Sequence, residues 1–132
     1  MKNYYLTLIF WGFAFSISAQ DKKDCLTVEP TYISRMPGFH LVSCKFSEFD
    51  TYKFSYIDLN NKTTYKSVNG TQRELRYEKD ANEPRKFSGL QIRTNYENAV
   101  IKAKGVSLSV RKDFFRMKQD DKEVFFKIDD AE

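Results

Sequence analysis

Histidine, tryptophan and glycine are scarce in this chain of 132 residues, and each scarcity removes a class of chemistry. His40 is the only histidine, so any histidine-based triad or metal cluster would depend on it, and its place after a Pro-Gly turn predicts a surface role. The five glycines form no Gly-x-Gly-x-x-Gly, Walker or Gly-x-Ser-x-Gly pattern, so nucleotide-binding loops and nucleophile elbows are not indicated. The one tryptophan, Trp11, lies in the N-terminal apolar segment, which leaves tyrosine and phenylalanine for any aromatic recognition of a sugar.

The acidic residues do not form a recognisable catalytic site either. Asp120-Asp121 fits a turn and Asp129-Asp130 lies near the C-terminus, whereas a glycosidase needs two carboxylates that face each other across a cleft. The sequence therefore predicts no catalytic, cofactor-binding or metal-binding residue. A small secreted enzyme without a known motif stays open as an alternative, and it would gather groups such as Tyr96 and Glu97 in a pocket.

The first nineteen residues are typical of a secretory signal peptide. Lys2 is followed by an uncharged run over 4–17 and by small residues that end at Ala19, which predicts cleavage before Gln20. The apolar run is shorter than the roughly 20 residues that a membrane-spanning helix needs. We therefore expect an exported single domain over 20–132, with no transmembrane span and no cysteine at its new N-terminus for a lipid anchor.

Two cysteines, Cys25 and Cys44, lie in the exported part of the chain. An even cysteine count in an exported protein predicts a disulfide, whereas a redox pair would have closer spacing such as Cys-x-x-Cys. In the chain-entropy treatment, closing a loop of this length stabilises the fold by about 3 kcal/mol.

Apolar and polar residues alternate through the first half of the exported part. Residues 20–38 are expected to form an irregular arm that ends in an Arg-Met-Pro-Gly turn. The alternation then predicts four strands, at 39–44, 51–58, 62–68 and 71–79. The last three are expected to form an antiparallel meander, because Asn69-Gly70 is the strongest short signal for a type I′ hairpin turn.

One helix is predicted over 88–104. Ser88 is a suitable N-cap, Gly105 a suitable C′ residue, and one apolar stripe runs along the segment through Ile92, Tyr96 and Val100. Further strands are expected at 106–110, 114–118 and 123–128, the last two forming a C-terminal hairpin. The predicted fold class is α+β, with a mostly antiparallel sheet packed on one main helix and one disulfide.

Basic residues gather around the end of this helix and the strands after it. The formal net charge of the chain is only +4, with both signs mixed along its length, so nucleic acid is not an expected partner. The sequence favours a simple interpretation of the basic group, in which it is a solvated face without a ligand. The alternative is a specific function, an anion-binding surface for polyanionic envelope material, made of Lys102, Lys104, Arg111, Lys112, Arg116 and Lys118.

Several local patterns occur in a familiar order. They are Arg35-Met36-Pro37-Gly38-Phe39 between the two cysteines, the aromatic segment 49–54, Leu75-Arg76-Tyr77, and the segment 90–99 with its Asn-Tyr-Glu-Asn-Ala ending. Over residues 25–128 the chain resembles the N-terminal module that precedes the OmpA-like peptidoglycan-binding domain in bacterial cell-envelope proteins.

The resemblance implies a location rather than an activity. It predicts an envelope module, periplasmic or at the outer membrane, with extracellular release as another destination, that binds an envelope protein or glycan without catalysis. The chain departs from the family where Phe125-Phe126 replace the usual tryptophan, and these 132 residues contain no OmpA-like domain, so peptidoglycan binding by that route is not implied. A missing terminal strand predicts an open sheet edge for a partner strand. A small periplasmic inhibitor or immunity protein is the alternative function.

Overall fold

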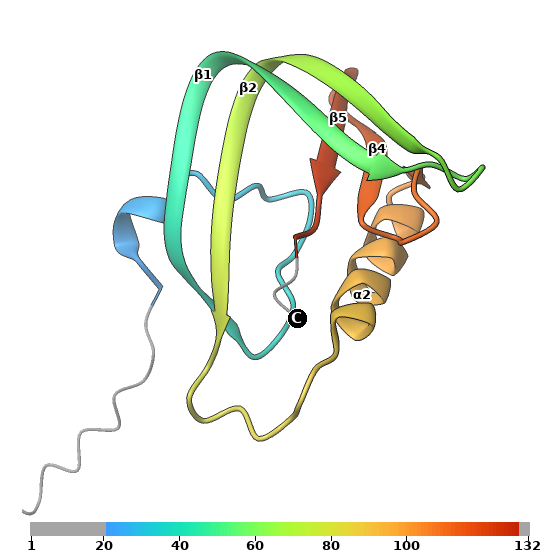
Figure 1. The fold of residues 1–132 in the computed structure, drawn as a ribbon. Coiled ribbons are helices and arrows are strands. Elements are labelled where there is room, and N and C mark those ends of the chain that lie inside the picture. The colour runs from blue at the N-terminus through green and yellow to red at the C-terminus, as the bar shows by residue number, and fades with distance from the viewer. Residues whose placement is uncertain (1–20, 130–132) are drawn as a thin grey trace, which may run out of the picture.

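A single long β-hairpin is the largest element of the protein. The structure, a computed structural model, describes residues 21–129; the predicted signal peptide lies outside them. Strand β1 (Phe39–Ile57) pairs antiparallel with β2 (Thr63–Lys79) from one end to the other, and the two strands arch together over the rest of the chain (Figure 1). This curved pair is called the ribbon below.

The ribbon corrects the predicted three-strand meander. Asn69-Gly70 is not a turn but lies inside β2, where Gly70 faces Asp50 and has φ of +152°. The prediction was wrong because β1 continues without a break through 45–50 and pairs with both flanks of Asn69-Gly70. One extra residue in β1, at Glu48-Phe49, is absorbed there as a bulge.

The turn between the predicted strands at 51–58 and 62–68 lies where those strands placed it, and it closes the ribbon. The Asp58 carboxylate accepts the backbone N–H groups of Asn60 and Lys62, both at 2.9 Å, and Asn61 takes a positive φ of 61°. These hydrogen bonds hold the pKa of Asp58 below its ordinary value, with the bond from Lys62 as the largest cause. An aspartate that satisfies turn amides in this way is a common local signal for chain reversal.

The face of the ribbon that is covered changes along its length. Near the hairpin end, Phe54 and Tyr56 pack on Phe114 with ring centroids 5.0 and 4.3 Å apart. Near the other end, the opposite face is covered, through Leu41 and its cross-strand partner Tyr77. Two-stranded ribbons twist strongly, and this twist turns first one face and then the other towards the body of the protein.

Helix α2 (Gly89–Lys102) confirms the predicted helix. Ser88 and Gln91 form a reciprocal capping box at its start. At its end, Lys104 rather than Gly105 is the C′ residue, with φ of 61°, which corrects the predicted C-cap. Gly105 is needed for another reason: a Cβ atom there would lie 2.5 Å from Val100 Cγ1 and 2.8 Å from the Arg116 carbonyl oxygen.

The C-terminal strands form a second antiparallel sheet. Its order is β3 (Val106–Ser107), β4 (Phe114–Gln119) and β5 (Lys122–Lys127). The predicted hairpin of the last two strands is confirmed, and its turn residues Asp120 and Asp121 both have positive φ, as a type I′ turn requires. The predicted strand over 106–110 is shorter than expected because the chain turns at Ser109, which forms a single bridge to Asp58.

The core lies between the ribbon, α2 and the second sheet. Its fully buried side chains include Leu41, Val100, Phe114 and Phe115. The N-terminal arm carries only a short 3-10 helix, η1 (Lys23–Cys25), and the predicted disulfide between Cys25 and Cys44 ties it to the ribbon. The α+β class, the antiparallel sheets, the one helix and the disulfide are thus confirmed. Across residues 21–129, no helix has both the length and the apolar character that crossing a membrane requires.

Candidate functional site: a basic hollow beside the helix end

Three of the six basic residues singled out in the sequence lie around one open hollow. Lys104, Arg116 and Lys118 line it together with Glu123, and its volume is about 470 Å³. Val106, which is exposed, also lines it, so apolar surface lies next to the cationic groups. We call this the basic hollow.

Local backbone geometry places the three cations together. The left-handed conformation of Lys104 ends α2 and turns the chain directly into β3. On β4, Arg116 and Lys118 are exposed on one face, whereas Met117 between them is buried on the other. Arg116 lies opposite Val106 of β3 and Lys118 lies opposite Glu123 of β5, so the hollow spans all three strands.

The charge of the basic hollow is largely uncompensated. Within residues 21–129, no ion pair joins Lys104, Arg116 or Lys118 to an acidic side chain. Glu123, the cross-strand neighbour of Lys118, is the one acidic residue in the lining. Three exposed cations against one carboxylate, over partly apolar walls, favour an anionic ligand that also has apolar or flat surface.

The other three predicted residues do not belong to the hollow. Lys112 has positive φ and its Nζ lies 2.9 Å from Glu97 Oε2 on α2, so its charge is compensated. Lys102 and Arg111 are exposed but do not line the hollow. The six residues therefore do not all belong to one site, and the turn from Ser109 to Lys112 carries Arg111 and Lys112 beyond the end of β3.

The residues named for an enzyme alternative have structural partners. The Tyr96 hydroxyl accepts the backbone N–H of Met36 at 3.4 Å, and burial raises the pKa of that hydroxyl. Glu97 pairs with Lys112, and neither Tyr96 nor Glu97 lines the basic hollow. Among the described residues, no group of three or more His, Cys, Asp and Glu side chains is arranged to hold a metal ion.

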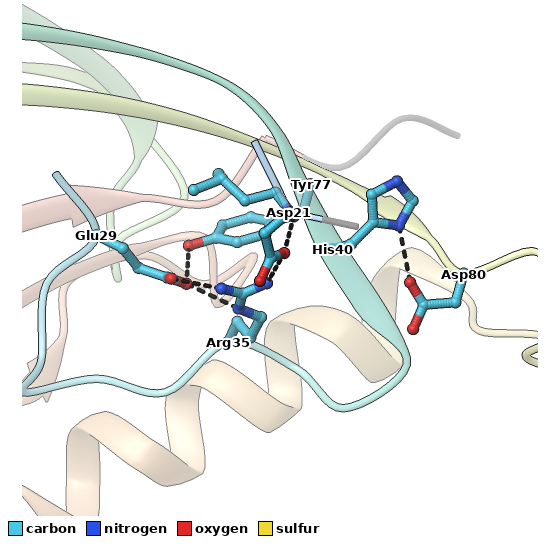
Figure 2. A network of polar contacts seen from close by, with 7 residues as sticks. Asp21, Glu29, Arg35, His40, Tyr77 and Asp80 are labelled. Atoms are coloured by element: carbon cyan, nitrogen blue, oxygen red, sulfur yellow. Dashed lines mark hydrogen bonds and ion pairs between the residues drawn. The ribbon is translucent and has the colours of Figure 1, made fainter. Parts of the chain in front are cut away.

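A polar network that the sequence did not suggest anchors the N-terminal arm (Figure 2). The Arg35 guanidinium lies between the carboxylates of Asp21 and Glu29, with its Nε 2.9 Å from Glu29 Oε1. Tyr77 of β2 donates its hydroxyl proton to the same Glu29 oxygen at 2.7 Å, and burial followed by this bond raises the Tyr77 pKa. The only sequence signal was the presence of acids in an otherwise irregular arm, which does not identify their partner.

The same network makes the stability of the protein depend on pH. Hydrogen bonds from Arg35 and from the Leu41 amide lower the pKa of Asp21 in the folded protein. The contribution of Asp21 to the free energy of unfolding is therefore complete above the ordinary carboxyl pKa of about 4. It is lost as the pH falls through the lower pKa that Asp21 has in the folded protein. We expect Asp21→Asn to reduce the free energy of unfolding by about 1 kcal/mol at pH 7 and to flatten its fall below pH 4.

Urea unfolding followed by circular dichroism at a series of pH values measures both effects. Asp24→Asn is the matched control, because Asp24 is an exposed acid of the same arm. If Asp21→Asn and the unmodified protein lost stability in parallel below pH 4, the anchoring role of Asp21 would be wrong.

His40 lies close to this network but pairs elsewhere. Its Nδ1 is 2.8 Å from Asp80 Oδ1, and the neighbouring Asp80 amide donates to the Gly38 carbonyl (Figure 2). The Pro-Gly turn is confirmed by the φ of +83° at Gly38, where a Cβ would collide with the Glu83 carboxylate. The only histidine therefore closes the open end of the ribbon.

The basic hollow thus lies where the end of α2 meets the three-stranded sheet of this α+β fold. Comparison with known protein families, with curated proteins and with solved structures finds no match to this chain.

Proposed function

We propose that this protein is an exported, non-enzymatic binding module of the bacterial cell envelope, and that its basic hollow binds polyanionic envelope material. The N-terminal signal sequence, the disulfide and the resemblance to an envelope module support the location. The charge of the hollow supports the ligand class, which is a phosphate- or carboxylate-bearing glycan or glycolipid.

One observation carries the proposal. Lys104, Arg116 and Lys118 come from two separate segments of the chain, yet they converge on one hollow and form no ion pair with an acidic side chain among residues 21–129. A purely solvated face would not need to concentrate three free cations next to exposed Val106. An amphipathic anion can satisfy both features, since its charged groups reach the cations while its apolar part covers Val106.

Charge reversal in the hollow tests the proposal directly. We expect Lys104→Glu combined with Arg116→Glu to weaken binding to purified lipopolysaccharide by about tenfold or more, because each cation near an anionic surface contributes about 1 kcal/mol. Isothermal titration calorimetry at low and moderate salt measures this loss, and wild-type affinity should fall as salt rises.

Two variants serve as controls for this experiment. Lys86→Glu reverses one charge at an exposed loop residue, and Lys112→Glu reverses one within the basic group but outside the hollow; the two combined equal the charge change of the test variant. Both should keep affinity within about twofold, with circular dichroism confirming the fold. If all variants weakened binding equally, the effect would come from net charge and not from the hollow. If the wild-type protein bound neither lipopolysaccharide nor peptidoglycan sacculi, the proposed ligand class would be wrong.

A further inference from the structure

Within residues 21–129, the outer edge of β2 is unpaired over its whole length. The outer edge of β1 is used at both ends: the Lys22 amide donates to the Leu41 carbonyl at 2.9 Å and the Val110 amide to the Ile57 carbonyl at 3.2 Å. No comparable backbone hydrogen bond reaches the outer edge of β2 from any other part of residues 21–129. Such an edge is a template for another strand, and an isolated two-stranded ribbon is only marginally stable in water.

The middle of the ribbon is the part with the least cover. The covered face changes there, so both faces are solvated, and Phe46 and Phe49 remain 50% and 75% exposed. Gly70 lies at this point of β2, and no atom comes within 4 Å of the place where its Cβ would be. A glycine in the interior of a strand permits the close approach of another backbone.

We propose that two copies of this protein associate through this edge, with β2 pairing antiparallel to β2 of the second copy about a two-fold axis at Gly70. Residues 66–74 of each copy would form the central ladder. A two-fold axis at Gly70 places residues at equal distances before and after it directly opposite each other. Lys66 then lies opposite Glu74 of the second copy, and the reverse pair forms at the other end of the ladder.

The charges of the strand are compatible with this register. Both Lys66–Glu74 pairs join opposite charges, and every other pair within the ladder includes at least one uncharged residue, so no like charges face each other. A second copy is therefore a chemically complementary occupant for the edge. The proposal concerns a surface separate from the basic hollow and does not depend on its ligand.

The body of the protein covers opposite faces of the ribbon at its two ends, and this arrangement leaves space for a second copy. On one side of Gly70 the body covers the face that carries Phe54 and Tyr56, and on the other side it covers the face that carries Leu41 and Tyr77. Antiparallel pairing brings unlike ends of the two ribbons side by side. The two bodies would consequently lie on opposite faces of the four-stranded sheet at each end, where they do not obstruct each other.

A charge-swap experiment tests the dimer and its register together. We expect Lys66→Glu alone and Glu74→Lys alone each to weaken self-association by about tenfold or more, since both symmetric pairs become repulsive. The double variant Lys66→Glu/Glu74→Lys should restore wild-type association. Residues 66 and 74 are about 26 Å apart along one strand, so rescue within one copy is not expected.

Sedimentation equilibrium of the exported chain, with its disulfide intact, measures the dissociation constants. Lys53→Glu is the matched control, because the Lys53 ammonium, like that of Lys66, lies over an aromatic ring, but Lys53 belongs to β1. It should leave association within about twofold of wild type. A monomer at every concentration, a dimer indifferent to the single variants, or rescue of Lys66→Glu by Glu78→Lys instead of Glu74→Lys would overturn the proposal.

Discussion

Replacement of Phe114 by alanine is expected to cost about 3–5 kcal/mol of unfolding free energy, because it removes a large aromatic ring from the centre of the core. Phe114 is fully buried, and its ring packs on Phe54 and Tyr56 of the ribbon and on Phe125 of β5. The alanine variant would leave a cavity at the point where the ribbon rests on the second sheet. Because small domains have only about 5–15 kcal/mol of total stability, a large unfolded fraction is expected at 37 °C.

Urea denaturation followed by tyrosine fluorescence and far-ultraviolet circular dichroism measures this loss. Phe49→Ala is the matched control, since it removes the same side chain from a site that is 75% exposed. It should change the unfolding free energy by less than about 0.5 kcal/mol. Comparable losses for the two variants would mean that the ribbon is not anchored through Phe114.

Removal of the disulfide is the second large effect. We expect Cys25→Ala/Cys44→Ala to lose about 3 kcal/mol of stability, which corresponds to a fall of about 10–15 °C in Tm for a domain of this size. Cys25 is buried, and the bond is the covalent link that closes the arm onto the ribbon. Differential scanning calorimetry measures the change.

The unmodified protein with a reductant provides the control for this experiment, because it keeps both cysteine side chains while the bond is broken. Its Tm should fall to within a few degrees of the double variant. Intact mass measurement and thiol titration of the protein purified without reductant should find no free thiol. Two free thiols in the protein purified without reductant, or a Tm that is unchanged by both treatments, would contradict the stabilising role of the bond.

Elements with local causes were predictable from the sequence. The capping box of Ser88 and Gln91 marks the start of α2. Asp120-Asp121 forms a tight turn through its own backbone conformation, independently of what the hairpin packs against. The disulfide followed from cysteine count and the expected compartment. Each of these features depends on residues that are close along the chain or on covalent chemistry, so the sequence carries the whole signal.

Features that depend on distant partners were not predictable in the same way. Asn69-Gly70 has the local chemistry of a turn, but its flanks pair with β1 instead of with each other, and long-range pairing overrides the local preference. The role of Arg35 depends on Tyr77 and on two acids of the arm that only the folded chain brings together. Likewise, the six basic residues form one group along the sequence, but only Lys104, Arg116 and Lys118 line the hollow in the fold.

The sequence by itself determined the chemistry that this protein has at its disposal: one histidine, no familiar catalytic motif, a disulfide, and basic residues around one helix end. The tertiary structure decided which of these residues act together. Lys104, Arg116 and Lys118 form a hollow because a helix end and a strand meet there, and the edge of β2 is open because no other described strand pairs with it. Composition specifies which chemical groups are present. A site that is built from distant segments of the chain also requires a backbone geometry, and long-range packing sets that geometry.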